Sequence, residues 1–121
     1  MSTVSGVKHD SYKPMANLVI QGFPRALLEV SKVATYGATK YTPNGWKEVD
    51  NGETRYRDAL MRHYLEEPIN PNDLETGFAQ MAHIVWNGLA VLELMLMKKE
   101  LAASQTVDSS KVWYSDQSEV K

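Results

Sequence analysis

Cysteine is absent from the 121 residues of this chain. Disulfides, thiolate zinc sites and thiol nucleophiles are therefore excluded, and the composition is compatible with a reducing compartment. Clusters of basic residues are also missing, since 13 Lys and Arg are scattered among 15 Asp and Glu, for a net charge of -2. The electrostatic footprint of a nucleic-acid-binding protein is thus not present, and we expect no nucleic-acid partner.

Long apolar runs are scarce too. The opening residues, MSTVSGVKHD, lack the apolar stretch of a signal peptide, and polar residues break the most apolar segment before it reaches membrane-spanning length. We therefore expect a soluble, cytoplasmic protein with no membrane partner. The length suits one compact domain and is too short for two.

The spacing of apolar residues predicts an all-α fold, a small domain with three main helices. The first begins at Pro24 and runs to residue 36 or a little beyond. The second spans about 53–66, and the third runs from 73 to about 101. Residues 1 to about 22 show little periodicity and are expected to form an irregular N-terminal arm.

The third predicted helix is longer than one small core requires. It measures on the order of 40 Å at 1.5 Å per residue, so we expect a partner subunit to cover the excess in a dimer or larger homo-oligomer. One face of this helix carries a continuous apolar stripe that is expected to form the core. The stripe consists of Leu74, Phe78, Met81, Val85, Leu89, Leu92 and Leu96.

The domain is expected to occupy residues 1–101. The remaining residues, 102–121, are rich in Ser, Asp, Gln and Lys and predict a mostly flexible tail. Within this tail, Val112, Trp113 and Tyr114 can dock locally.

A few polar residues interrupt the apolar third helix. Glu75, His83 and Asn87 follow a four-residue ladder through Ala79, which places them along one side of the helix. Polar groups beside a core need partners, because burying them unpaired costs free energy. Those partners are other side chains, a metal or a ligand, and a structural hydrogen-bond network accounts for the pattern as well as a binding site does.

Carboxylates without cysteine, and only three histidines, suit an oxygen-ligated ion such as Mg²⁺ or Mn²⁺ better than zinc. The acids near helix interiors are Glu29, Asp58, Asp73 and Glu75. The chain contains no nucleophile motif and no glycine-rich phosphate loop, so hydrolysis by a metal-activated water fits best among enzymatic functions.

Each of these acids also has a simpler interpretation. Glu29 with Lys32, and Asp58 with Arg62, have the spacing of ordinary surface ion pairs on helices. His63, beside a tyrosine, is typical of a structural histidine.

In the arm, Lys8 and Lys13 bracket Asp10. Such residues can hold a polyphosphate or simply keep a loose chain end soluble.

Four spaced motifs together resemble one family. GVKHDSYKP, the Glu29 helix continuing into YGATKYTPNGW, RYRDALMRH, and DLETGFAQMAH followed by Asn87 occur here in the order found in the phage dATP/dGTP diphosphohydrolases. That family is grouped with MazG-like nucleoside triphosphate pyrophosphohydrolases. The resemblance covers residues 6 to about 97, and four motifs in order are more specific than any one alone.

This resemblance implies an all-helical domain that uses Mg²⁺ to cleave a purine deoxynucleoside triphosphate into monophosphate and pyrophosphate, in host cytoplasm if the chain is phage-encoded. It implies Glu29, Asp58 and Glu75 as metal ligands, with Asp73 in reserve. The implied catalytic residues are Glu29, Glu75 and His83.

The same resemblance implies a substrate-binding set. Lysines would meet phosphate oxygens, Arg62 and His63 would orient phosphate or the acids, and the aromatic segment 36–46 would hold the purine. An alternative is that these aromatics close the core over a helix junction. The whole set comprises Lys8, Asp10, Lys13, Tyr36, Lys40, Tyr41, Asn44, Trp46, Arg62, His63 and Asn87.

Two positions depart from the family pattern. Lys32 follows Glu29 at three residues, where MazG-like enzymes carry a second acid, and Gln80 stands where a histidine is expected. A non-catalytic protein of the same fold that sequesters a nucleotide or a nucleotide signal is therefore the competing hypothesis. A purely structural helical oligomeriser is a third.

Overall fold

The computed structural model describes residues 6–105 and is helical, with no strand in that range. Its body consists of α2 (Pro24–Lys40), α3 (Gly52–Glu66) and α4 (Gln80–Ser104). A short 3-10 helix, η1 (Gly45–Glu48), lies between α2 and α3, and one turn of helix, α1 (Asn17–Ile20), lies in the arm. The predicted all-α fold with three main helices is confirmed.

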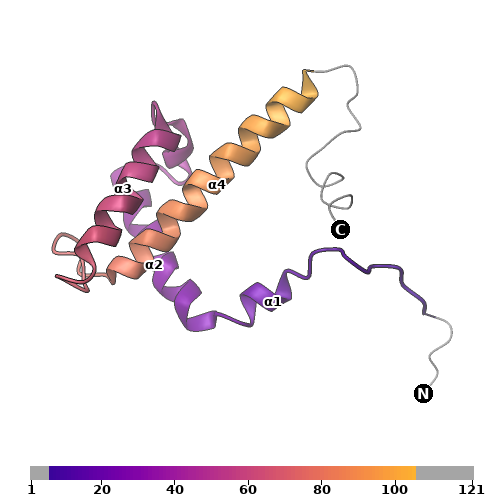
Figure 1. The fold of residues 1–121 in the computed structure, drawn as a ribbon, viewed down its shortest axis with the longest axis horizontal. Helices are drawn as coiled ribbons and strands as arrows, with labels where there is room; N and C mark the ends of the chain where they lie inside the picture. Colours follow the sequence, from indigo (N-terminus) through magenta and orange to yellow (C-terminus); the bar gives the residue numbers. More distant parts are fainter. Residues whose placement is uncertain (1–5, 106–121) are drawn as a thin grey trace.

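Helix α4 forms the centre of the body. It packs mainly along α3 and to a lesser extent on α2, and its C-terminal half projects beyond both (Figure 1). Helix α2 begins at Pro24, as predicted, because proline suits the first helical position. It ends at Lys40, before a turn in which Asn44 adopts a left-handed conformation with φ of 64°.

The predicted start of the third helix at residue 73 is wrong, because α4 begins at Gln80. Residues 73–79 form a loop that an isolated antiparallel bridge between Asn72 and Ala79 closes at its base. Gly77 has a φ of 77°, which glycine adopts readily and which a right-handed helix excludes. Glu75 and Ala79 therefore do not share a helical ladder with His83 and Asn87.

The predicted apolar core stripe is also wrong. The buried face of α4 instead carries Gln80, Ala82, His83, Asn87, Ala90 and Val91. Buried partners on α2 are Val30 and Val33. Met81, Val85, Leu89 and Leu92 of the stripe are about half exposed along α4, and Leu74 in the loop is 85% exposed. The chain thus places polar residues inside and leaves an apolar face outside.

By length and composition alone, α4 is long and apolar enough to cross a membrane, contrary to the expectation from the sequence. The same helix packs on α3 and buries Gln80, His83 and Asn87. These contacts are those of the central helix of a helical domain.

From residue 6, where the described part begins, the N-terminal arm is irregular as predicted, apart from α1, and leads away from α3 and α4 (Figure 1). The predicted tail is helical at 102–104, and its part from 106 onward, with Val112, Trp113 and Tyr114, lies outside the described residues.

Candidate functional site

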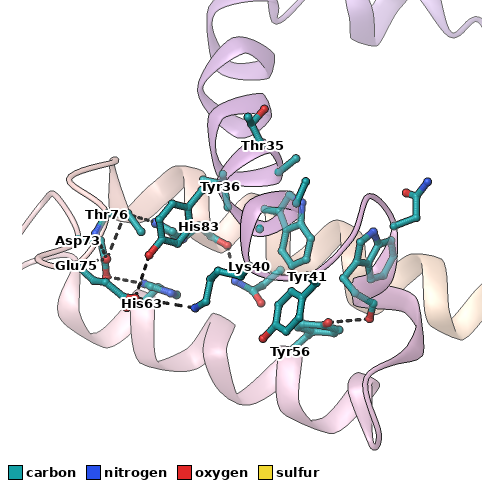
Figure 2. A pocket seen from close by; sticks show the side chains of 18 of the residues that line it. Thr35, Tyr36, Lys40, Tyr41, Tyr56, His63, Asp73, Glu75, Thr76 and His83 are labelled. Atoms are coloured by element: carbon teal, nitrogen blue, oxygen red, sulfur yellow. Dashed lines mark hydrogen bonds and ion pairs between the residues drawn. The ribbon is translucent and has the colours of Figure 1, made fainter.

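A cavity of about 680 Å³ lies between the C-terminal half of α2, one side of α3, the start of α4 and the loop between α3 and α4. Its two ends differ chemically (Figure 2). His63, Asp73, Glu75 and Thr76 gather at one end, and Tyr41 and Tyr56 lie at the other, with Lys40 between them. The cavity therefore has a polar end and an aromatic end, with the positively charged side chain of Lys40 between them.

Asp73 shapes the loop at the polar end. Its Oδ2 accepts hydrogen bonds from the backbone N–H groups of Glu75 (3.1 Å) and Thr76 (2.9 Å) and from the Thr76 hydroxyl (3.2 Å). Aspartate commonly makes such bonds to the residues that follow it in a turn. The Gly77 N–H donates to the Asp73 carbonyl, and the Asp73 N–H donates to the Phe78 carbonyl. The loop is thus a fixed scaffold for the carboxylates of Asp73 and Glu75.

The charge of Asp73 is stabilised in the fold. Burial alone would raise its pKa, but hydrogen bonds from Thr76 and the nearby imidazoles of His83 and His63 lower the pKa below its ordinary value. Its Oδ1 lies 3.7 Å from His63 Nδ1. Asp73 therefore presents a carboxylate to the cavity at neutral pH.

Two histidines stand side by side behind this loop. The rings of His63 and His83 are stacked, with centroids 4.5 Å apart. His63 Nδ1 lies 2.7 Å from Oε1 of Gln80, an atom that can only accept, so Nδ1–H donates and the lone pair is on Nε2. Gln80 is 1% exposed, which makes it a buried anchor for His63.

His83 is held by Thr76 in a similar way. Its Nε2 lies 2.7 Å from Thr76 Oγ1, which in turn donates to Asp73. Because the hydroxyl proton is directed to the carboxylate, Nε2–H of His83 is the donor to Oγ1. Burial, and then the neighbouring His63, lower the pKa of His83. A chain of hydrogen bonds therefore runs from a neutral His83 through Thr76 to an ionised Asp73.

One group of side chains at the polar end has metal-ligand geometry. Ligand atoms of His63, Glu66 and Asp73 all lie within 4.8 Å of one another. Two carboxylates and one imidazole suit Mn²⁺ well, and Mg²⁺ also binds through one or two carboxylates when phosphates complete the coordination. The donor set therefore fits the ions expected from the sequence.

Lys40, between the two ends, pairs with Glu75 of the polar end. The Lys40 ammonium is 3.9 Å from Glu75 Oε2, and the Tyr36 hydroxyl donates to the same oxygen at 3.1 Å. This hydrogen bond, followed by burial and the charge of Glu75, raises the pKa of the Tyr36 phenol. Both contacts are exposed, so Lys40 can turn toward an anion without a large cost.

The aromatic end is built by three rings packed edge to face. Trp46, Tyr56 and Trp86 have pairwise centroid distances of 5.5 to 6.0 Å, and the Tyr56 hydroxyl donates to the Trp46 carbonyl at 2.7 Å. Burial raises the pKa of the Tyr56 phenol. Tyr41, in contrast, is 54% exposed beside them. Trp46 thus closes the junction between η1, α3 and α4 while also lining the cavity.

Most residues singled out from the sequence line this one cavity. They are Tyr36, Lys40, Tyr41, Asn44, Trp46, Arg62, His63, Asp73, Glu75, His83 and Asn87. Asn87 is buried and donates to the His83 carbonyl at 2.8 Å.

The three acids expected to share a metal do not come together. Glu75 lines the cavity, but Glu29 pairs with Lys32 at 2.7 Å and lines a separate hollow beside Tyr36 and Phe78. Asp58 is exposed and lines neither hollow. Lys8, Asp10 and Lys13 lie in the exposed arm and also line neither one.

Sequence reasoning missed Glu66, Thr76, Tyr56 and Trp86 as residues of the cavity. Glu66 could have been predicted from the sequence, since it follows His63 by three residues and so shares its face of α3. Thr76 gave no signal, because its role depends on the loop that replaces the expected helix.

None of the curated proteins and no solved structure matches the chain. Residues 3–104 match the family described as dATP/dGTP diphosphohydrolase, N-terminal. The match covers the arm, the three helices and every residue that lines the cavity. The chain therefore belongs to the dATP/dGTP diphosphohydrolase family, as the four motifs of its sequence indicated.

Proposed function

We propose that the chain hydrolyses dGTP or dATP to the deoxynucleoside monophosphate and pyrophosphate with a divalent cation. The observation that carries this proposal is the cavity with carboxylates and imidazole at one end, aromatic rings at the other and Lys40 between them. A nucleoside triphosphate complements this arrangement, because its phosphates would lie at the carboxylate end with the cation and its base would lie against the aromatic rings. The family to which the chain belongs supports this substrate class.

His63, Glu66 and Asp73 would hold the cation, with a ring nitrogen of His63 as the nitrogen ligand. The cation, Mg²⁺ or Mn²⁺, would supply Lewis acidity, offsetting phosphate charge and making a bound water more acidic. This set replaces the grouping of Glu29, Asp58 and Glu75 as our proposal. Roles for Glu29 and Asp58 stay predictions from the sequence.

The remaining residues at the polar end would orient substrate and move the proton. Lys40 and Arg62 would bind phosphate oxygens and offset charge on the departing pyrophosphate. A water oxygen would bond to the α-phosphorus as the bond from that phosphorus to the bridging oxygen breaks. Glu75 would accept the proton of the water, since its carboxylate is exposed to the cavity. His83 would keep Thr76 and Asp73 in position.

The purine would lie at the aromatic end. Tyr41 is the ring with the most exposed surface there, and Trp46 and Trp86 provide fixed walls. An aromatic face stacks with a base and needs little further ordering to do so. Asn44, at the rim, would offer a polar group to the base edge.

The test is a nucleotide panel with Mg²⁺ or Mn²⁺, resolved for triphosphate, monophosphate and pyrophosphate. Two double variants distinguish the two proposed sets of metal ligands. One carries Glu66→Gln and Asp73→Asn, and the matched one carries Glu29→Gln and Asp58→Asn. The first pair should remove turnover and cation binding, and the second should keep both. Loss of cation binding only in the second pair would overturn the assignment to His63, Glu66 and Asp73.

Sequestration of an intact nucleotide is the second candidate. One observation favours it: Asp73 Oδ2 already accepts three hydrogen bonds from Glu75 and Thr76 of the loop. The metal cluster therefore has few carboxylate oxygens free for catalysis. The same panel decides, because sequestration predicts saturable binding with the nucleotide recovered unchanged. In either case the proposed setting is the host cytoplasm, where a phage protein of this kind would act on the nucleotide pool.

A further inference from the structure

The N-terminal arm, defined as residues 6–23, is exposed throughout. Helix α1 within it has no buried residue. Leu18, Val19 and Ile20 on α1 and Phe23 beyond it expose more than half of their surface. A helix this short is unstable alone in water, so its apolar residues need a surface to pack on.

The junction between the arm and α2 is fixed. The Phe23 N–H donates to the Val19 carbonyl at 3.1 Å, and the Leu27 N–H donates to the Phe23 carbonyl at 2.9 Å, so hydrogen bonds run from α1 into α2. A Cβ at Gly22 would collide with the Leu18 carbonyl oxygen, and Pro24 fixes its own φ. The arm therefore points away from the body and does not fold back onto its own cavity (Figure 1).

Helix α4 carries a complementary apolar surface. Met81, Val85, Leu89 and Leu92, which we call the α4 stripe, follow helical spacing on one face and are 42% to 53% exposed. The same stretch of α4 contributes His83, Trp86 and Asn87 to the cavity on its neighbouring face. A segment lying on the stripe would therefore end close to the cavity.

A second copy of this chain is the occupant that these surfaces favour. Each copy carries one uncovered arm and one uncovered stripe, so a two-fold dimer covers all four surfaces with the same contact made twice. A stable interface buries about 800 Å² on each partner, which calls for both surfaces and not one alone.

The arm also carries charge that the cavity can use. Lys8 and Lys13 flank a turn closed by a hydrogen bond from the Lys13 N–H to the Asp10 carbonyl at 3.0 Å. The cavity is lined by two cations, Lys40 and Arg62, and by three acids, Glu66, Asp73 and Glu75. A strongly anionic triphosphate needs further cations there.

We propose that the arm of one copy lies on the α4 stripe of a second copy and brings Lys8 and Lys13 to the phosphate end of that copy's cavity. The delivery of the lysines rests on the proposed function, whereas the exchange of arms does not. Each active site is then composite, with its helices from one chain and its arm lysines from the other.

Cysteine cross-linking tests the exchange without reference to activity, because the native chain has no thiol. Leu18→Cys on the arm and Leu89→Cys on the stripe are co-expressed as separate, differently tagged chains and oxidised gently. The expected product is a disulfide between the two chains. The matched control replaces Leu89→Cys by Met61→Cys, since Met61 is equally exposed on α3. Preferential cross-linking to the Met61 variant, or a disulfide within one chain carrying both substitutions, would overturn the exchange.

Complementation tests the delivery of the lysines. A chain with Lys8→Ala and Lys13→Ala is co-expressed with a chain carrying Asp73→Asn, and dGTP turnover of the mixture is compared with each variant alone. Random pairing makes half of the dimers mixed, and each mixed dimer has one complete site, so about a quarter of native turnover should return. No recovery means that the arm acts on its own chain, and the delivery is refuted.

Failure of the proposed function would look different. Native protein that neither binds nor hydrolyses dGTP, together with an arm-to-stripe disulfide in the cysteine variants, would refute both the activity and the delivery of the lysines while upholding the exchange of arms. Native protein that is active but monomeric by light scattering would refute the exchange and leave the activity standing.

Discussion

The imidazole rings of His63 and His83 stack with their centroids 4.5 Å apart and their planes 11° from parallel. Each ring is anchored from its far side, His63 by Gln80 and His83 by Thr76. Protonating both rings would bring two positive charges together in a partly buried place. The pair therefore favours a neutral His83, and Asp73 compensates for charge that does form.

Stability of the metal-free protein should fall as the pH drops below 6.5. The pKa of His83 in the fold lies below its ordinary 6.5, so the unfolded chain takes up the proton first. The stabilising contribution is complete above pH 6.5 and decreases below it. Asp73 acts in a lower window, since its contribution is present above its ordinary pKa of 3.8 and is lost as the pH falls through its lowered value.

Urea unfolding in chelator between pH 8 and pH 5 measures this effect, and His83→Gln should flatten the pH dependence in that range. His9→Gln, in the exposed arm, is the matched control and should leave the slope unchanged. A native slope that survives His83→Gln would contradict the assignment.

Replacing Gln80→Leu should destabilise the fold by about 1–3 kcal/mol, because His63 Nδ1 loses its buried acceptor. The free energy of unfolding from urea titration measures the loss. Gln21→Leu, at an exposed position, supplies the control and should change stability little. Equal effects of the two substitutions would show that the bond to His63 is not the cause.

Thr76 connects Asp73 with His83, so Thr76→Val should reduce both stability and cation affinity. The hydroxyl bonds to His83 Nε2 and Asp73 Oδ2 and accepts from the Phe78 N–H at 3.2 Å. A loss of about 1–3 kcal/mol is expected for an unpaired buried group. Thr76→Ser keeps the hydroxyl and should restore most of both properties. Calorimetric Mn²⁺ titration measures the cation affinity, and thermal unfolding measures the stability. A Ser variant as impaired as the Val variant would contradict this role of the Thr76 hydroxyl.

Substitution of an exposed aromatic residue of the cavity should affect substrate binding, whereas substitution of a packed one should affect stability. Tyr41→Ala should raise KM for dGTP about three- to tenfold with little change in melting temperature, because the ring is largely exposed and stacking is worth about 0.5–1.5 kcal/mol. Trp46→Ala should cost on the order of 3 kcal/mol of stability, since it empties the packed cluster with Tyr56 and Trp86. Kinetics and thermal unfolding of the same preparations test both, and an unchanged KM in the Tyr41 variant would remove it from the substrate site.

The sequence predicted the helices well where local signals are strong. Pro24 begins α2 as expected, and α3 spans Gly52–Glu66 against a predicted 53–66. Tyr36, Tyr41 and Trp46 of the aromatic segment 36–46 line the cavity, and Trp46 also packs on Tyr56 at the helix junction. Binding of the purine by this segment stays a prediction.

Two errors share one cause, namely that the third helix and its core face were both placed from the spacing of apolar residues alone. The third helix was expected to begin at residue 73, although Asp73 instead holds a loop whose hydrogen bonds reach Phe78. The apolar stripe of α4 was assigned to the core, while Gln80 and His83 occupy the buried face because each has a buried partner. Hydrophobic periodicity does not reveal such pairing, since the partners lie on other elements.

The bridge between Asn72 and Ala79 has a consequence for how the chain can vary in length. The segment between them supplies Asp73, Glu75 and Thr76, each facing a different element: α3, α2 and α4. Adding or deleting one residue there would shift all three contacts while the bridge stays closed. An insertion in the exposed turn at 41–44 would disturb only the aromatic end of the cavity, and it should therefore leave these three contacts in place.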